Sequence, residues 1–316
     1  MYLEKGYGIM DRKICLALGA IHFPLSMASY FIRAFERRED VELWLFGPFT
    51  GDYIPWAGGM RIPPKYVKVP HFALPRETIG LRISSGIINS QMPWTPDLTL
   101  LIDAGWHTSD RPAGRVVAHV QTDPHVLKLT YKLPKSYSDV SFCMQQAYIE
   151  KGEEYLPYGF DPTVHYPMDL EKVYDACLIG LQYEHRNQLV SRLRQRNLNV
   201  YYTIGEIYDE YRERYNSSRV ALSWSSMEDT PARVFEAFGM SMALVANRTP
   251  DLSNFFLEGE DYLGFGSVDE AEKQVFTLLL DDERRAEIGY NAYRKALAGH
   301  TWDIRVNQIL NTCGLV

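Results

Sequence analysis

The sequence lacks the features that place many proteins in a class at first sight. Its four cysteines lie far apart and include no C-x-x-C pair, which argues against a zinc site and against a disulfide framework. No apolar run reaches the length of a membrane span without charges, and the first residues hold no apolar core of the signal-peptide type. We therefore expect a cytoplasmic protein without a membrane span and without a metal site.

A glycine-rich dinucleotide-binding loop is also missing. The first apolar strand ends at Gly19 and continues as GAIHFP, without the spacing G-x-G-x-x-G. This absence argues against an oxidoreductase built on a nicotinamide-binding domain. The 316 residues, 46% hydrophobic and 23% charged, instead have the composition of a globular protein and the length of two α/β domains.

Short apolar strands alternate with helices in the first half of the chain. The predicted strands are 13–19, 41–47, 98–103, 115–120 and 139–144. A helix is predicted at 26–38, with Ser26 as its N-cap, whereas the proline-rich residues 48–96 resist assignment. Apolar strands of this length are typical of a parallel sheet that helices cover on both faces.

The alternation starts again after a proline-interrupted connector at 155–168. The predicted strands of the second half are 174–180, 198–203, 219–224 and 241–247, and its predicted helices are 184–197, 231–240 and 268–300. The fold class is therefore α/β, with two doubly wound domains that face each other.

Histidines follow three of the predicted strands of the first half. They are His22, His107 and His125, and Asp123 precedes the last of them. Ligands of such sheets bind just beyond the carboxyl ends of the strands. One histidine there would most often be structural, but three at equivalent positions point to a binding cleft.

The stretch SWSSMEDTPARVFEAFG carries two glutamates eight positions apart, Glu228 and Glu236. Pro231 is suited to the first position of a helix, where its missing N–H costs nothing, and Thr230 or Asp229 would then be the N-cap. Glu228 therefore lies in the loop that enters the helix, and Glu236 lies about one and a half turns inside it. Both can face the same cleft.

Arg233 falls in the first turn of this helix, where a cation opposes the helix dipole. Its presence suggests a nearby anion. Phosphate suits the free backbone N–H groups of a helix start and also the guanidinium fork. The alternative is an ion pair with Glu228 or Asp229 at the surface.

The spacing of Glu228 and Glu236 resembles the E-x7-E signature of retaining GT-B glycosyltransferases. The fuller string DTPARVFEAFG resembles the spore-maturation-type subgroup, which is related to the large family 4 of these enzymes. The resemblance extends over residues 97 to 310, including the connector YLPYGFDPTVHYP and the C-terminal helices. It implies domains at 1–165 and 166–298, with 299–316 crossing back onto the first domain.

The resemblance implies roles for both glutamates in binding a nucleotide-sugar donor. Glu236 would bind the ribose hydroxyls, and Glu228 would lie near the donor sugar and its anomeric carbon. On the first domain, His107, Asp123 and His125 are the candidates for acceptor and sugar contacts. Asp123 would be the base if the reaction needs one. No cofactor is expected besides the donor, most simply a UDP-sugar.

The resemblance also implies a diphosphate site. The residues assigned to it are Thr230, Pro231, Ala232 and Arg233. Gly180 and Gly19, at the ends of the first strands of the two domains, are further candidates for binding the nucleotide-sugar. Arg186 matches the basic residue that stabilises the leaving diphosphate. The family's second basic residue, a lysine a few positions later, has no counterpart here, so Arg233 is the candidate to replace it.

The expected function is thus a retaining hexosyltransferase that uses a nucleotide-diphosphate sugar. Its acceptor is left open between a hydroxyl of a glycan, protein or small molecule and a hydroxymethylated base in DNA, as in viral GT-B enzymes. The basic stretch 61–82 keeps DNA open as an acceptor, although its charges can also be scattered solvated charges on a loop. The net charge of −7 argues mildly against DNA. A catalytically idle protein that binds nucleotide-sugars or glycans is the other alternative.

Overall fold

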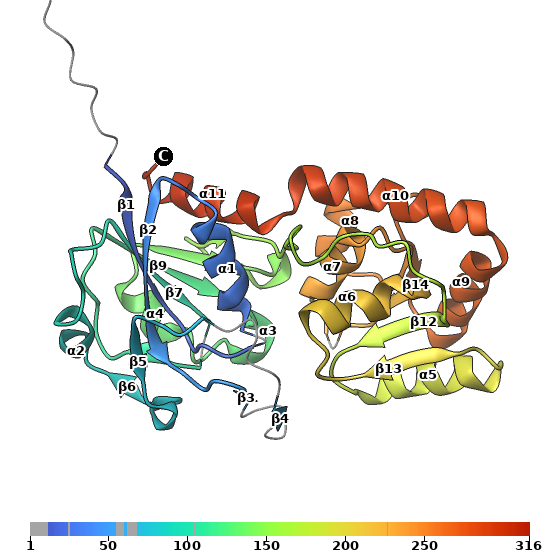
Figure 1. The fold of residues 1–316 in the computed structure, drawn as a ribbon, viewed down its shortest axis with the longest axis horizontal. Coiled ribbons are helices and arrows are strands. Elements are labelled where there is room, and N and C mark those ends of the chain that lie inside the picture. The colour runs from blue at the N-terminus through green and yellow to red at the C-terminus, as the bar shows by residue number, and fades with distance from the viewer. Residues whose placement is uncertain (1–11, 25, 55–59, 62–67, 104, 226) are drawn as a thin grey trace, which may run out of the picture.

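The computed structural model describes residues 12–24, 26–54, 60–61, 68–103, 105–225 and 227–316. This part of the chain forms two parallel sheets with helices around them, one sheet in each half of the molecule (Figure 1). We call the part built on the first sheet the N-terminal domain and the part built on the second the C-terminal domain. No helix among the described residues is long and apolar enough to cross a membrane.

The sheet of the N-terminal domain has the strand order β11-β10-β9-β7-β1-β2-β5, with every neighbouring pair parallel. Its strands are β1 (Ile14–Gly19), β2 (Val41–Pro48), β5 (Phe72–Leu74), β7 (Leu98–Ile102), β9 (Val116–Gln121), β10 (Val140–Cys143) and β11 (Glu154–Tyr155). The bounds of five of these strands agree with the predicted bounds within two residues. The prediction works because a strand that is buried on both faces is a short apolar run in the sequence. The prediction of a parallel α/β sheet is confirmed.

The proline-rich stretch without a predicted structure consists of short elements. Those after β2 are β3 (Tyr53–Ile54), β4 (Met60–Arg61), β5, the 3-10 turn η2 (Arg76–Thr78), β6 (Arg82–Ile83) and α2 (Ser85–Asn89). Strand β6 pairs with β8 (His107–Thr108) rather than with the main sheet. Elements of two to five residues carry no periodicity that a sequence pattern can detect.

The other helices of the N-terminal domain are short. They are α1 (Met27–Glu36), α3 (Pro124–Leu127), α4 (Lys132–Tyr137) and the 3-10 turn η3 (Gln146–Tyr148). Ser26 occupies the N-cap position of α1, as predicted, but its hydroxyl does not cap the helix. It donates instead to the carbonyl oxygen of Ile21, at 2.9 Å, and so closes the loop between β1 and α1.

The sheet of the C-terminal domain has the order β13-β12-β14-β15-β16 and is also parallel. Its strands are β12 (Tyr174–Ile179), β13 (Val200–Thr203), β14 (Ser218–Ser223), β15 (Leu244–Asn247) and β16 (Leu263–Phe265). Its helices are α5 (Glu184–Gln195), α6 (Tyr208–Asn216), α7 (Ala232–Gly239), α8 (Pro250–Phe255), α9 (Val268–Leu280) and α10 (Asp282–Gly299). Helix α11 (Trp302–Thr312) follows.

The break after α9 and the start of α7 are two differences from the predicted helices that have a clear physical reason. The segment 268–300, expected to be one helix, is broken at Asp281, whose carboxylate accepts from the Arg284 N–H at 2.8 Å and so caps α10. Helix α7 begins at Ala232 rather than at Pro231, which has an extended conformation with ψ 156° and occupies the cap position. Thr230 and Asp229 therefore lie one residue further from the helix than expected.

The two domains are joined by a double crossing of the chain. The connector after β11 runs beside the segment between α10 and α11, with Phe160 N–H donating to His300 O and Trp302 N–H donating to Phe160 O, both at 3.0 Å. Helix α11 then packs against α1 of the N-terminal domain (Figure 1). The last helix thus belongs spatially to the first domain.

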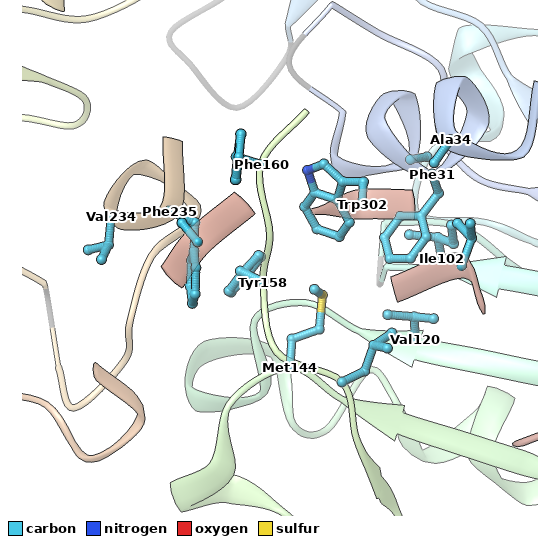
Figure 2. Close-up of a cluster of buried hydrophobic side chains, with 14 of the residues drawn as sticks. Phe31, Ala34, Ile102, Val120, Met144, Tyr158, Phe160, Val234, Phe235 and Trp302 are labelled. Carbon is cyan, nitrogen blue, oxygen red and sulfur yellow. The ribbon is translucent and has the colours of Figure 1, made fainter. Parts of the chain in front are cut away.

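A single apolar cluster runs through this crossing. Figure 2 shows Val234 and Phe235 of α7, Phe160 of the connector, and Trp302 of α11 beside Phe31 of α1. The rings of Trp302 and Phe31 lie 4.8 Å apart, and both side chains are fully buried. Because the cluster has members from both domains, packing in one domain depends on the other.

A buried ion-pair network reinforces the crossing. The carboxylate of Asp161, in the connector, accepts from Arg33 Nε at 2.7 Å and from Arg37 Nη1 at 3.2 Å, both on α1. Burial opposes ionisation of Asp161, but the arginine charges and the Thr163 hydrogen bond outweigh it and lower the pKa of this carboxyl. Arg37 also pairs with Asp303 of α11 at 2.8 Å, so connector, first helix and last helix are held together.

Replacement of Phe160 with alanine tests the packing at the crossing. The ring is fully buried against Gly239 of α7, where a Cβ added to the glycine would lie 2.3 Å from Phe160 Cδ2. We expect Phe160→Ala to lower the free energy of unfolding by about 3–5 kcal/mol, measured by urea denaturation. The control Leu280→Ala removes a side chain that is 84% exposed and should change it by less than about 0.5 kcal/mol. Equal effects of the two changes would contradict a core at the crossing.

Candidate functional site

The loop that carries Glu228 is held by the N-terminal domain. Gln145, which follows β10 and is 1% exposed, pairs its side-chain amide with the backbone of Thr230. Its Oε1 accepts from Thr230 N–H at 2.9 Å, and its Nε2 donates to Thr230 O at 3.3 Å. The Thr230 N–H, expected to face a diphosphate, therefore already has a partner in this structure.

Acidic groups of the two domains meet beside this loop. Glu228 is exposed, whereas Asp229 is buried and accepts from the Met227 N–H at 3.0 Å. The negative charge of Asp229 acts on Asp123 and His125, which follow β9 of the N-terminal domain. The structure therefore places Asp123 and His125 close enough to the E-x7-E loop for the charge of Asp229 to act on both.

Asp123 has a perturbed pKa. Burial, and next the nearby carboxylate of Asp103, raise this pKa to about 6, with a smaller contribution from Asp229 and a partly offsetting hydrogen bond from the Thr122 hydroxyl. Asp103 has a φ of 69°, unusual for a residue other than glycine, and accepts from Tyr131 at 3.1 Å. A carboxylate with a pKa near 6 in a cluster of like charges can accept a proton at neutral pH.

Opposite these acids, two arginines of the C-terminal domain converge on Gly180, at the end of β12. A Cβ placed on Gly180 would lie 2.1 Å from Arg233 Nη2 and 3.6 Å from Arg186 Nη1. Gly180 has a φ of 148°, which disfavours any other residue. The absence of a side chain here leaves the space that the Arg233 guanidinium occupies.

Arg186 is anchored by backbone carbonyls. It lies in α5 with 3% exposure and donates from Nε to Trp224 O at 2.6 Å and from Nη1 to Leu181 O at 2.7 Å. Burial, and next the charge of Arg233, lower the pKa of Arg186 to about 10, so it remains a cation at neutral pH. The guanidinium is therefore fixed in place while its charge is not neutralised by the groups it contacts.

The guanidinium of Arg233 has fewer hydrogen-bond partners than that of Arg186 among the described residues. Its Nε and Nη1 are buried without a hydrogen-bond partner among the described residues. Over the same part of the chain neither Arg233 nor Arg186 forms an ion pair, so the alternative in which Arg233 pairs with Glu228 or Asp229 does not occur there. Arg186 is buried and Arg233 is half-buried, and this arrangement suits an anion because a charge that is removed from water and unpaired is unfavourable. Helix α7 starts beside them with its free N–H groups at Ala232 and Arg233.

The carboxylate of Glu236 lies between two tyrosines. It lies in α7, is 7% exposed, and accepts from Tyr30 of α1 at 3.0 Å through Oε1 and from Tyr211 of α6 at 2.7 Å through Oε2. His165 Nε2 approaches Oε1 at 3.8 Å, but burial lowers the pKa of His165, so this imidazole is neutral at pH 7. Both oxygens of Glu236 therefore already have phenolic partners.

His107 lies in the interior of the N-terminal domain, with 8% exposure, and its ring centroid is 5.9 Å from that of His119. Burial lowers the pKa of His107 to about 4 and that of His119 to about 3. Neither ring nitrogen of His107 has a hydrogen-bond partner among the described residues. His107 is thus a neutral, buried group, whereas His125 lies beside Tyr148 at the Glu228 loop, with its ring centroid 5.8 Å away.

Gly19 is packed rather than open. A Cβ at this position would lie 2.6 Å from Phe46 Cζ and 2.9 Å from Leu101 Cδ2, so the end of β1 needs glycine for close packing. Its assigned contact with the nucleotide stays a prediction.

The basic stretch 61–82 is only partly described. Lys65 and the side chain of Arg61 lie outside the described residues. Lys68 pairs with Glu36 of α1, and Arg76 lies 4.8 Å from the centroid of the Tyr53 ring. Two of its charges are thus engaged within the chain.

The site contains residues that sequence reasoning did not single out. Gln145 directly follows the predicted strand 139–144, so the rule that located Asp123 could have located it as well. Tyr30 gave no such signal, because it is 206 residues from Glu236 in the chain. Among the described residues, no group of three or more His, Cys, Asp and Glu side chains is arranged to hold a metal ion.

The fold is that of the GT-B proteins, with two Rossmann-like domains. The chain is similar to Anabaena HepE in complex with UDP-glucose, with a TM-score of 0.64, 10% identity, and coverage of 96% of this chain and 100% of that chain. It is similar to sucrose-phosphate synthase from Thermosynechococcus elongatus, with a TM-score of 0.61, 12% identity, and coverage of 95% and 98%. It is also similar to an alpha-glucosyltransferase in complex with UDP and a 13-mer DNA, with a TM-score of 0.61, 10% identity, and coverage of 96% and 100%.

The sequence comparison covers the second half of the chain. Residues 166–311 match the sequence profile of a family described as "Glycosyl transferase-like". No curated protein matches the chain by sequence. The matched segment contains Gly180, Arg186, Arg233 and both glutamates of the E-x7-E motif.

The buried histidines predict how stability depends on pH. The pKa of His107 is about 4 in the folded chain but about 6.5 when unfolded, so the unfolded state gains a proton first as the pH falls. The free energy of unfolding should therefore fall as the pH is lowered from about 6.5 towards 4. Each such histidine contributes up to about 1.4 kcal/mol to this fall for each pH unit. Urea unfolding of His107→Gln should show a shallower decline than the wild type. An equally steep decline in the variant would contradict a buried neutral imidazole.

Proposed function

We propose that this protein is a glycosyltransferase that moves a sugar from a UDP-sugar to an acceptor hydroxyl. The observation that carries the proposal is that the two cations Arg186 and Arg233 lie together beside Gly180. Neither of them has a carboxylate partner among the described residues. A diphosphate supplies the missing negative charge and suits two guanidinium groups beside a helix start. The family profile of the second half and the UDP or UDP-glucose in similar structures support this choice.

The reaction breaks the bond between the anomeric carbon and the diphosphate and forms a bond from that carbon to the acceptor oxygen. Negative charge grows on the leaving diphosphate in the transition state, where Arg186 and Arg233 stabilise it. Arg186 is held by the carbonyls of Leu181 and Trp224, so little reorganisation is needed when the charge develops. Arg233 takes the place of the lysine that the resembling family has.

We infer retention of the anomeric configuration from the resemblance to the E-x7-E enzymes. On this inference the exposed Glu228 contacts the donor sugar, and the acceptor lies on the side of Asp123 and His125. Asp123, with its raised pKa, receives the acceptor proton if the departing diphosphate does not. We place the chain in the spore-maturation-type subgroup, with domains at 1–165 and 166–298 and a returning segment at 299–316.

A thermal-shift panel with UDP, GDP, ADP and their common sugars tests the donor class. Binding to the folded state raises the melting temperature by mass action, and we expect the rise with UDP and one of its sugars. Release of UDP from that sugar would then distinguish a glycosyltransferase from a protein that binds the nucleotide-sugar without catalysing a reaction. The acceptor screen begins with simple glycans and hydroxymethylated DNA, since a similar structure holds DNA. No shift with any nucleotide at millimolar concentration would contradict the proposal.

Loss of Arg186 should affect turnover more than donor binding. We expect Arg186→Ala to lower the rate of UDP release from the donor by about a hundredfold or more, because the charge it stabilises is largest in the transition state. The matched control is Arg194→Ala, about two turns further along α5, where the guanidinium donates to Val200 O at 2.9 Å, its one hydrogen bond among the described residues. Similar rates for the two variants would show that Arg186 has no part in the reaction.

The pKa of Asp123 predicts an acidic limb in the pH profile. A carboxylate with a pKa of about 6 is ionised at neutral pH and protonated below it, so turnover that uses it as a base falls as the pH drops through 6. In Asp123→Asn this limb should disappear and the rate should be low throughout. The exposed Asp169→Asn serves as control and should keep the wild-type profile. A wild-type profile in Asp123→Asn would exclude Asp123 as the base.

A further inference from the structure

Glu236 is the residue to which the resemblance to the E-x7-E enzymes assigns the donor ribose, yet its carboxylate already accepts two hydrogen bonds. Tyr30 donates to Oε1 at 3.0 Å and Tyr211 donates to Oε2 at 2.7 Å. The side chain is 7% exposed. A ribose hydroxyl must therefore either displace one tyrosine or find a lone pair in a nearly closed space.

The two tyrosines differ in which domain they come from. Tyr211 lies on α6 of the same domain as Glu236, whereas Tyr30 lies on α1 of the N-terminal domain. The Tyr30 hydrogen bond therefore crosses between the domains. Tyr211 can stay with Glu236 through any relative movement of the domains, but Tyr30 cannot.

Tyr30 is held firmly in its position. Its ring stacks on Trp302 of α11, with centroids 5.6 Å apart and planes 14° from parallel, and the Arg33 guanidinium lies 4.7 Å from its centroid. Burial, and next the charge of Glu236, raise the pKa of Tyr30, so its hydroxyl keeps the proton that it donates. The phenol is thus a neutral, preplaced donor aimed at a carboxylate of the other domain.

We propose that Tyr30 and the ribose of the donor compete for Glu236, so that the Tyr30–Glu236 hydrogen bond is a tether between the domains that the donor replaces. This inference rests on the proposed function, because it requires a nucleotide at the Arg186 and Arg233 site. Hydrogen bonds to a charged group are among the stronger ones in proteins. The tether therefore weakens donor binding and links it to the contact between α1 and α7.

The test measures the affinity of two nucleotides for two variants by calorimetry. Tyr30→Phe removes only the competing hydroxyl and should tighten UDP binding by roughly tenfold, equivalent to about 1.4 kcal/mol. With dideoxy-UDP, which lacks both ribose hydroxyls, the same variant should bind as the wild type does. This ligand dependence separates competition for Glu236 from any general effect on folding.

Ser29→Ala is the matched control. It removes another hydrogen bond between the domains, which joins the hydroxyls of Ser29 and Tyr208 at 3.1 Å, without altering the partners of Glu236. Its affinity for both nucleotides should equal that of the wild type. An equal gain in Ser29→Ala, or a gain with dideoxy-UDP in Tyr30→Phe, would show that a looser domain contact is responsible and would overturn the proposal.

The failure of this inference can be distinguished from the failure of the proposed function. If the wild type binds UDP and Arg233→Ala abolishes that binding, but Tyr30→Phe binds UDP no more tightly, only the tether is wrong. If Tyr30→Phe binds UDP more weakly, Tyr30 orients Glu236 for the ribose rather than competing with it, and the tether is again wrong. If the wild type does not bind UDP, or binds it regardless of Arg233, both are overturned.

Discussion

The site depends on the two segments of chain that cross between the domains and bond to each other there. The backbone of Phe160 bonds with that of His300 and Trp302, so the connector and the final segment form one short ribbon between the sheets. The apolar cluster and the Asp161 ion pairs fix α1 and α11 to this ribbon. Because α1 and α7 are both packed against it, Tyr30 of one domain can reach Glu236 of the other.

The resulting site is electrostatically divided. Asp103, Asp123 and Asp229 form an acidic side where β7, β9 and the Glu228 loop meet. Arg186 and Arg233 form a basic side at Gly180. A donor that carries a diphosphate and a separate acceptor that carries the reacting hydroxyl would fit this division, since the leaving group needs cations and the attacking hydroxyl needs a base.

Much of this arrangement could be predicted from the sequence, and the exceptions have physical reasons. The strands can be predicted because buried parallel strands are apolar runs, and the position of Asp123 at the carboxyl end of β9 follows from the same pattern. Helix α6 was missed because its buried face is made of tyrosines, Tyr208, Tyr211 and Tyr215, within a highly polar sequence. The tether at Glu236 could not be predicted, because its partner is distant in the chain and meets it only after both domains have folded.

The most direct measurement is a calorimetric titration of the wild type and Arg233→Ala with UDP and with uridine. We predict that the wild type binds UDP far more tightly than uridine, because the diphosphate neutralises Arg186 and Arg233. In Arg233→Ala this difference should shrink by roughly tenfold or more, with uridine binding unchanged. Equal affinity for UDP and uridine in the wild type, or an undiminished difference in the variant, would contradict an anion site at Gly180.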